Sequence, residues 1–129
     1  MKARWLCIAT AALLVVSAVL AQVTGTPAAK APQPQALALE TLAKKSGCFE
    51  CHSVDKKVVG PAYRDVAARY KDDPKARAAL IETVKKGGKG HWSDITNGVP
   101  MPPYSGRLSA AEITRLVDWV LSFKDGEPK

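Results

Sequence analysis

The sequence predicts an all-α fold of three to four helices in one small domain. Apolar residues recur at intervals of three and four in several segments, and one of these segments starts with the capping pattern Ser-x-x-Glu. No stretch alternates between apolar and polar residues as a half-buried strand does. With 129 residues and three cysteines, the chain is too short for a multidomain enzyme and too poor in cysteine for a disulfide-dense scaffold.

The N-terminus has the features of an export signal. Lys2 and Arg4 precede an apolar run over residues 5–21, and small residues stand near its end. This pattern predicts a secretory signal peptide over 1–21, cleaved after Ala21, and therefore a periplasmic location. A retained membrane anchor is the alternative, because the run approaches the roughly 20 residues that span a bilayer. Cleavage would leave no membrane-inserted segment and would lower the net charge of +7 by the two basic residues of the signal.

The segment 22–36 is rich in Pro and Ala and has no large apolar residue beyond Val23. Such a composition cannot bury enough surface to offset the entropy of ordering the chain, so a disordered leader is predicted here. The folded domain is expected over 37–129. A domain of this size buries only a small hydrophobic core and usually needs a source of stability beyond the packing of its own side chains.

The first two predicted helices are short. Apolar residues from Leu37 to Ala43 form one stripe, which ends before Gly47, a natural helix stop. The second helix is predicted over 63–70, because apolar residues at helical spacing follow a Gly-Pro break at 60–61.

The third and fourth helices have clear start signals. Asp73 and Pro74 suit the N-cap and first position of a helix that runs to Gly87. Ser109 and Glu112 form a capping-box pattern at the start of the last helix. The apolar residues that follow fall on one helical face: Ile113, Leu116, Val117, Val120 and Leu121.

Cys48, Cys51 and His52 form the C-x-x-C-H motif of covalent haem attachment. Two cysteines at this spacing lie on one turn, where each can form a thioether with a haem vinyl group, and the adjacent His52 can then ligate the iron. A redox-active dithiol is the first alternative but is typical of a βαβ context, and a structural zinc site would need a second pair of ligands. The motif therefore predicts one covalently bound haem c with its iron.

The long loop over 87–108 is the expected source of the second iron ligand, since loops of this length in compact domains are usually functional or disordered. Met101 is the only methionine left once the signal is removed, and three prolines fix the backbone around it. A lone methionine is more often core filler, but a packing residue would not need that rigidity. His91 is the rival ligand. Ligation by His and Met raises the haem potential, which suits an electron carrier.

Two further features fit a haem pocket. The chain turns back after His52 at residues 60–62, where a backbone carbonyl would accept a hydrogen bond from His52 Nδ1 and fix the ring tautomer. Trp92 carries an indole N–H that can donate to a haem propionate, and a buried loop tryptophan is the equally weighted alternative.

The chain resembles the class I c-type cytochromes, the small monohaem electron carriers of bacteria. The resemblance rests on four ordered segments: 47–52, 59–68, 100–103 and 119–121. It implies a small cytochrome c fold, in which the helices wrap around one haem and the first and last helices cross. It also implies thioethers at both cysteines and iron ligation by His52 and Met101. By the same resemblance, Pro61 supplies the carbonyl for His52, and Trp92 bonds to a propionate.

Three positions depart from the family pattern. The stretch 92–101 is longer than in the shortest members of the family. Tyr104 stands where many relatives carry an Asn that supports the Met ligand, and Thr83 replaces a basic residue that some relatives use against a propionate. The distal hydrogen bonding and the reduction potential therefore do not carry over from the resemblance.

The expected function is single-electron transfer between respiratory redox partners, from a membrane cytochrome complex to a terminal reductase or oxidase, by a monomer that is not an enzyme. The alternatives are a gas-sensing haem protein from which Met101 dissociates, and a peroxidase-like or subunit role. Nucleic acid is not an expected partner, because the basic residues are scattered and no binding motif accompanies them. Four lysines flank the haem motif and either steer acidic partners or form an ordinary solvated face: Lys44, Lys45, Lys56 and Lys57.

Overall fold

The computed structural model describes residues 34–123, and the predicted signal peptide and most of the predicted leader lie outside this range. Within it, the chain forms helices and no strand, apart from one isolated bridge between Gly88 and Met101. The predicted all-α class is confirmed. The elements are α1 (Pro34–Lys45), the 3-10 turn η1 (Cys48–Glu50), α2 (Tyr63–Tyr70), α3 (Ala76–Lys86), α4 (Ser93–Thr96) and α5 (Ala110–Ser122).

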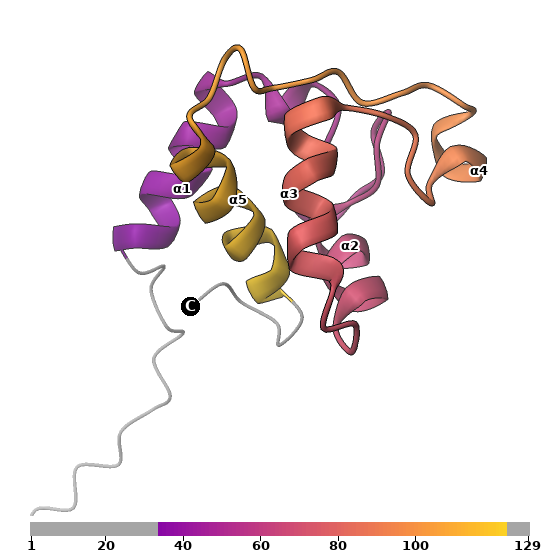
Figure 1. Ribbon diagram of the computed structural model, residues 1–129, viewed down its shortest axis with the longest axis horizontal. Helices are drawn as coiled ribbons and strands as arrows, with labels where there is room; N and C mark the ends of the chain where they lie inside the picture. The colour runs from indigo at the N-terminus through magenta and orange to yellow at the C-terminus, as the bar shows by residue number, and fades with distance from the viewer. Residues whose placement is uncertain (1–33, 124–129) are drawn as a thin grey trace, which may run out of the picture.

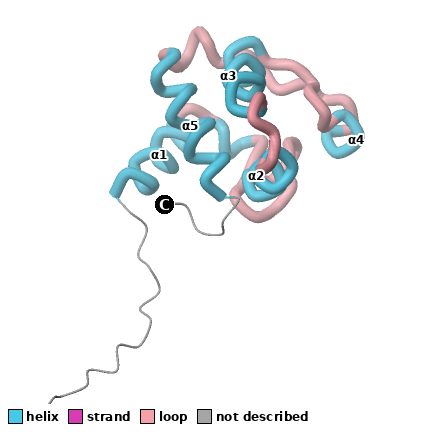
Figure 2. The backbone as a smooth tube through the Cα atoms, turned by 60° about the horizontal axis from the view of Figure 1, so that its bottom comes forward, coloured by secondary structure: helices cyan, strands magenta, loops and turns pink. Residues whose placement is uncertain are grey.

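Helix α5 is the element around which the longer helices are arranged, since it contacts α1, α2 and α3. Figure 1 shows α1 and α5 inclined to each other, with α3 on the other flank of α5. Seen from a second direction, α4 is set apart from the other helices at the end of its loop (Figure 2). The predicted contact between the first and last helices is therefore present.

The amphipathic pattern of α5 explains its central place. Its buried side chains come from one face: Ile113, Leu116, Val117 and Trp119. The helix starts with the predicted capping box, in which Ser109 Oγ accepts a hydrogen bond from Glu112 N at 3.3 Å, and Glu112 Oε2 accepts one from Ser109 N at 2.8 Å. Two backbone N–H groups that the helix itself cannot satisfy are thus bonded.

Loss of this cap has a measurable expected cost. Ser109→Ala should lower the free energy of unfolding of the holoprotein by about 1 kcal/mol, because the N–H of Glu112 loses its partner. Ser105→Ala makes the same chemical change at an exposed loop position and should change stability by less than about 0.5 kcal/mol. Denaturant unfolding followed by haem absorbance compares the two, and equal midpoints for both variants would contradict the role of the cap.

Helix α1 begins at Pro34, earlier than the predicted start at Leu37. Proline is tolerated in the first turn because the N–H groups there have no partner within the helix. Ala36 is buried, so the extra turn belongs to the core rather than to the predicted leader over 22–36. The boundary was missed because three residues without a large apolar side chain give no periodic signal.

Helix α3 also differs from its prediction at its start. Asp73 Oδ1 accepts a hydrogen bond from Lys75 N at 2.8 Å, as a capping side chain does, but the regular helix begins only at Ala76. The other end is as predicted, since Gly87 follows the last residue with a φ of 72° and donates to Thr83 O at 2.7 Å. The loop predicted over 87–108 contains the single turn of α4.

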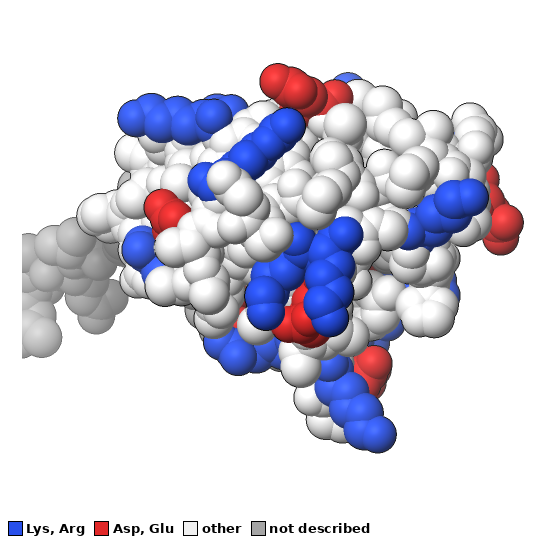
Figure 3. All heavy atoms as spheres, turned by 45° about the horizontal axis from the view of Figure 1, so that its top comes forward, with Lys and Arg blue, Asp and Glu red and all other residues white. Residues whose placement is uncertain are grey.

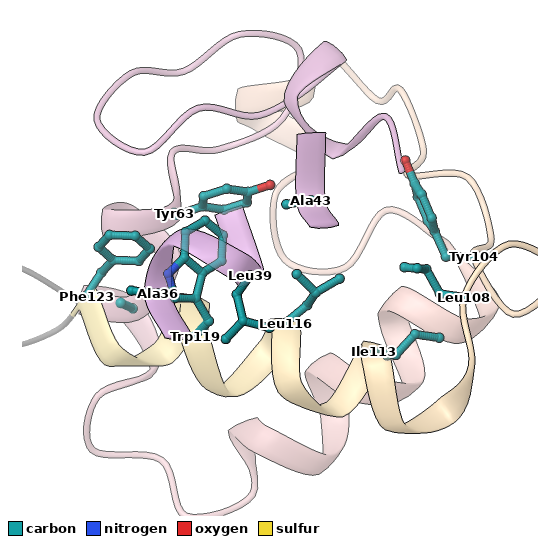
Figure 4. Packing of buried hydrophobic residues seen from close by; sticks show 11 residues of the cluster. Ala36, Leu39, Ala43, Tyr63, Tyr104, Leu108, Ile113, Leu116, Trp119 and Phe123 are labelled. Carbon is teal, nitrogen blue, oxygen red and sulfur yellow. The ribbon is translucent and has the colours of Figure 1, made fainter. Parts of the chain in front are cut away.

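Aromatic rings fill the core between α2 and α5. Tyr63 packs edge-on against Trp119, with ring centroids 5.5 Å apart, and Trp119 packs in the same way against Phe123 at 5.1 Å. Figure 4 shows these rings at one end of α5, with Leu116 at its middle and Ile113, Leu108 and Tyr104 toward the other end. The protein core therefore lies along one face of α5.

Candidate haem-binding site

A cavity of about 300 Å³ lies inside the helical framework, and every helix contributes to its wall. This volume is in the range of pockets that hold small ligands and cofactors. All six residues that the sequence singled out line this one cavity, although they come from separate segments of the chain: Cys48, Cys51, His52, Pro61, Trp92 and Met101. His91, the rival ligand, also lines it but is an exposed residue.

The attachment motif is held as one tight turn. Gly47 precedes it in the left-handed region, with a φ of 83°, a conformation that glycine adopts at little cost. Cys51 N and His52 N both donate to Cys48 O, at 3.3 and 3.0 Å. This turn places both cysteines and the histidine at the cavity wall, and burial raises the pKa of the Cys48 thiol.

His52 is oriented by the backbone that follows it. Its Nδ1 lies 2.7 Å from Pro61 O, and because a carbonyl only accepts, Nδ1 carries the proton. The other ring nitrogen, Nε2, is then a free donor atom for a metal. Burial lowers the pKa of His52, so the imidazole is held in the neutral form that ligates metals. The ring also stacks on Tyr63, with centroids 5.4 Å apart and 18° between the planes.

The packing around His52 requires a glycine at position 60, because the backbone there touches the imidazole ring. The sequence did not reveal this contact. A Cβ atom at Gly60 would lie 2.4 Å from His52 Cε1, well inside van der Waals contact. The backbone has little room to retreat, because Gly60 N donates to Cys51 O at 2.7 Å and Tyr63 N donates to Ser53 O at 2.9 Å. The backbone of residues 60–61 therefore packs closely against the His52 imidazole.

Met101 is positioned by its backbone. It exchanges two hydrogen bonds with Gly88, in which Met101 N donates at 2.8 Å and Gly88 N donates at 2.9 Å. Gly87 comes so close that a Cβ atom there would lie 2.5 Å from Met101 O. The sequence predicts that the prolines hold the backbone around Met101. The structure shows that Gly87 and Gly88 hold it as well.

Trp92 precedes α4 and forms part of the cavity wall. The Arg69 guanidinium lies 5.1 Å from the centre of its ring, and Tyr70 packs edge-on at 6.4 Å. These two contacts from α2 fix the indole beside the cavity. Thr83 also lines the cavity, but its hydroxyl donates to Ala79 O at 2.9 Å within its own helix.

Tyr104 has a role that the sequence left open. It is buried, and its side chain acts on Cys48: burial raises the pKa of the Cys48 thiol, and the Tyr104 side chain opposes this rise. Figure 4 shows the hydroxyl pointing toward the chain segment that carries the attachment motif. Its backbone N–H donates to Val84 O at 3.0 Å, and the Arg107 guanidinium lies 5.6 Å from its ring. Tyr104 thus joins the Met101 loop to the attachment turn and to α3.

The cavity fits a haem on its chemistry. Its wall combines two thiols one turn apart, a neutral imidazole with one nitrogen free, and a thioether, all among mostly apolar neighbours. Imidazole and thioether are the axial ligands of c-type haem iron.

The fold and the site together define a monohaem c-type cytochrome, with one covalently bound haem c and its iron. The chain belongs to the cytochrome c family, whose family model (Cytochrome c) matches residues 36–124.

Relatives with known names agree with this assignment. Cytochrome c-551 of Allochromatium vinosum is 50% identical over 88 residues, which cover 68% of this chain and 88% of that protein. Cytochrome c-551 of Pseudomonas aeruginosa is 45% identical over 85 residues, covering 66% of this chain and 76% of that protein. The crystal structure of Nitrosomonas europaea cytochrome c552 superposes with a TM-score of 0.59 and 42% identity, over 66% of this chain and 99% of that one. The predicted small cytochrome c fold is therefore confirmed.

Proposed function

We propose that this chain is a periplasmic electron carrier that passes single electrons between respiratory redox proteins as a monomer. A membrane cytochrome complex is the proposed donor, and a terminal reductase or oxidase the proposed acceptor. One observation carries the proposal: His52 and Met101 line the same cavity, each fixed by its own hydrogen bonds. The two side chains would thus both ligate a haem iron, and an iron without an open position favours electron transfer over chemistry on a substrate.

The geometry supports one role for each of the proposed binding residues. Cys48 and Cys51 would hold haem c by thioether bonds, and haem iron would supply one-electron redox chemistry. His52 Nε2 would ligate the iron, and the hydrogen bond from Nδ1 to Pro61 O holds the ring and raises its basicity. Met101 would supply a thioether ligand, which favours the reduced iron. Trp92 is the proposed donor to a haem propionate.

The surface beside the attachment motif suits a transient partner. Val58 and Val59 are 49% and 39% exposed, and Lys56 and Lys57 next to them are exposed as well. Exposed apolar side chains give short-range contact, and basic ones attract an acidic partner from a distance. Most charged side chains on the face drawn in Figure 3 are basic, in line with the net charge of +7.

The periplasmic location rests on the predicted signal peptide over 1–21, which lies outside the described residues. In the part from 34 to 123, no helix is both long and apolar enough to cross a membrane. Attachment of haem through C-x-x-C-H accords with an exported protein.

Carbon monoxide tests whether the iron has an open position. The reduced holoprotein is expected to leave its absorption spectrum unchanged under carbon monoxide at neutral pH, because Met101 occupies the sixth position. A potentiometric titration should fit a single one-electron curve. Ready formation of a carbon monoxide complex would instead favour the gas-binding function and would refute the carrier.

A further inference from the structure

The His52 imidazole is restrained by more than its hydrogen bond to Pro61. The bond of 2.7 Å between Nδ1 and Pro61 O holds one corner of the ring. A carbonyl oxygen accepts from a broad range of directions, so this bond by itself leaves the ring free to tilt about that corner. Tyr63 packs on the same imidazole, with ring centroids 5.4 Å apart and 18° between the planes. A nearly parallel ring opposes the tilt, because tilting would drive an edge of the imidazole into the phenol ring.

Tyr63 cannot move aside, because other aromatic rings enclose it. Trp119 packs edge-on against it at 5.5 Å, and Phe49 does the same at 5.7 Å with 86° between the planes. Phe123 lies nearly parallel to it, at 6.4 Å and 17°. Tyr63 is 6% exposed, and Figure 4 shows its ring beside those of Trp119 and Phe123. Tyr63 therefore presents a fixed flat surface to His52.

The backbone holds Tyr63 in register with the attachment turn. Tyr63 is the first residue of α2, and its N–H donates to Ser53 O at 2.9 Å. The next N–H, that of Arg64, donates to Val54 O at 3.1 Å. These two carbonyls belong to the residues that directly follow His52 in the chain. Tyr63 also lines the cavity, so the phenol ring and the imidazole are presented to it together from two bonded segments.

The angle of an iron-bound imidazole has an electronic consequence. In a low-spin ferric haem, the plane of the imidazole decides which iron d orbital holds the unpaired electron. That orbital in turn decides on which part of the macrocycle the unpaired spin is found. The bond between iron and Nε2 does not fix this angle, since the imidazole can rotate about it. The side chains around the ligand therefore determine the angle.

We propose that Tyr63 is a positioning residue for His52, whose ring sets the rotation of the imidazole about its bond to haem iron. The flat ring carries the effect, and the phenol hydroxyl has no part in it. The proposal rests on the proposed ligation of haem iron by His52. It does not depend on Met101 or on the redox partners that the protein serves.

The test is the proton NMR spectrum of the oxidised holoprotein with cyanide bound. Cyanide takes the iron position opposite His52 and is symmetric about its bond to iron, so the shifts of the haem methyl groups then depend on the angle of the imidazole. Tyr63→Leu removes the flat ring and keeps an apolar side chain, so the methyl resonances should change their order along the spectrum. Tyr63→Phe keeps the ring and should give the wild-type order.

Phe123→Leu is the matched control, because it also removes a buried ring that packs on Tyr63, but Phe123 does not line the cavity. It should lower the free energy of unfolding and leave the order of the methyl resonances unchanged. The reduced holoproteins are diamagnetic, so their spectra give the ring-current effect of each lost ring, which is subtracted. Loss of stability does not move this readout, because the spectrum is that of the folded holoprotein.

The wild-type order of resonances in Tyr63→Leu would overturn the proposal. The same change of order in Phe123→Leu would also overturn it, since the effect would then come from core packing in general. If Tyr63→Leu yields no holoprotein, Tyr63→Met takes its place, because the flexible methionine side chain fills gaps in a core. The carbon monoxide test uses the wild-type protein, so failure here leaves the carrier function standing.

Discussion

Gly60→Ala is expected to destabilise the holoprotein by about 3 kcal/mol and to weaken ligation by His52. The new methyl group would lie 2.4 Å from His52 Cε1, so either the imidazole or the 60–61 backbone must move. Movement of the imidazole displaces His52 from its place as an iron ligand. Movement of the backbone breaks the 2.7 Å hydrogen bond between His52 Nδ1 and Pro61 O. Denaturant unfolding followed by haem absorbance measures the loss.

Gly106→Ala is the control for this change. The Cβ atom at Gly106 would meet nothing within 4 Å, so the same substitution should change the midpoint little. Wild-type stability and an unchanged haem spectrum in Gly60→Ala would show that residues 60–61 pack less closely against His52 than the structure indicates.

Met101→Ala is expected to lower the reduction potential by more than about 60 mV, a tenfold change in a one-electron equilibrium constant. The thioether favours the reduced iron, and alanine offers no donor atom. The reduced variant should also bind carbon monoxide, because the sixth position is open. The fold should survive, since the bonds between residue 101 and Gly88 use only backbone atoms.

His91→Ala separates the two rival ligands. His91 is exposed and lies in the wall of the same cavity, so removal of its imidazole should leave both the potential and the inertness to carbon monoxide nearly unchanged. A large fall in potential in His91→Ala, together with little effect in Met101→Ala, would assign the ligand to His91.

The attachment site could be predicted from the sequence because its chemistry is local. Cys48, Cys51 and His52 lie on one turn, and their spacing alone indicates thioether attachment. The place of Met101 in the cavity wall could be predicted because its proline neighbours and the lack of a rival methionine are visible in the sequence. The last helix could be placed from its capping box and apolar face, both local patterns.

The contacts that join distant segments could not be predicted in this way. The bridge from Gly88 to Met101 and the approach of Gly60 to His52 depend on how loops fold back, and glycine pairs occur in many loops for other reasons. The burial of Thr96 depends on α4, whose four residues are too few to show a helical period. Helix α1 starts at Pro34 rather than Leu37 because only the core packing of its first turn reveals that it belongs to the domain.

The far-red absorption of the oxidised wild-type protein reports whether Met101 sulfur is bonded to the haem iron. A bond between ferric haem iron and a methionine sulfur gives a weak charge-transfer band in this region. We expect the band at neutral pH and its loss in Met101→Ala. Absence of the band in the wild type, or its persistence in Met101→Ala, would show that Met101 does not ligate the iron.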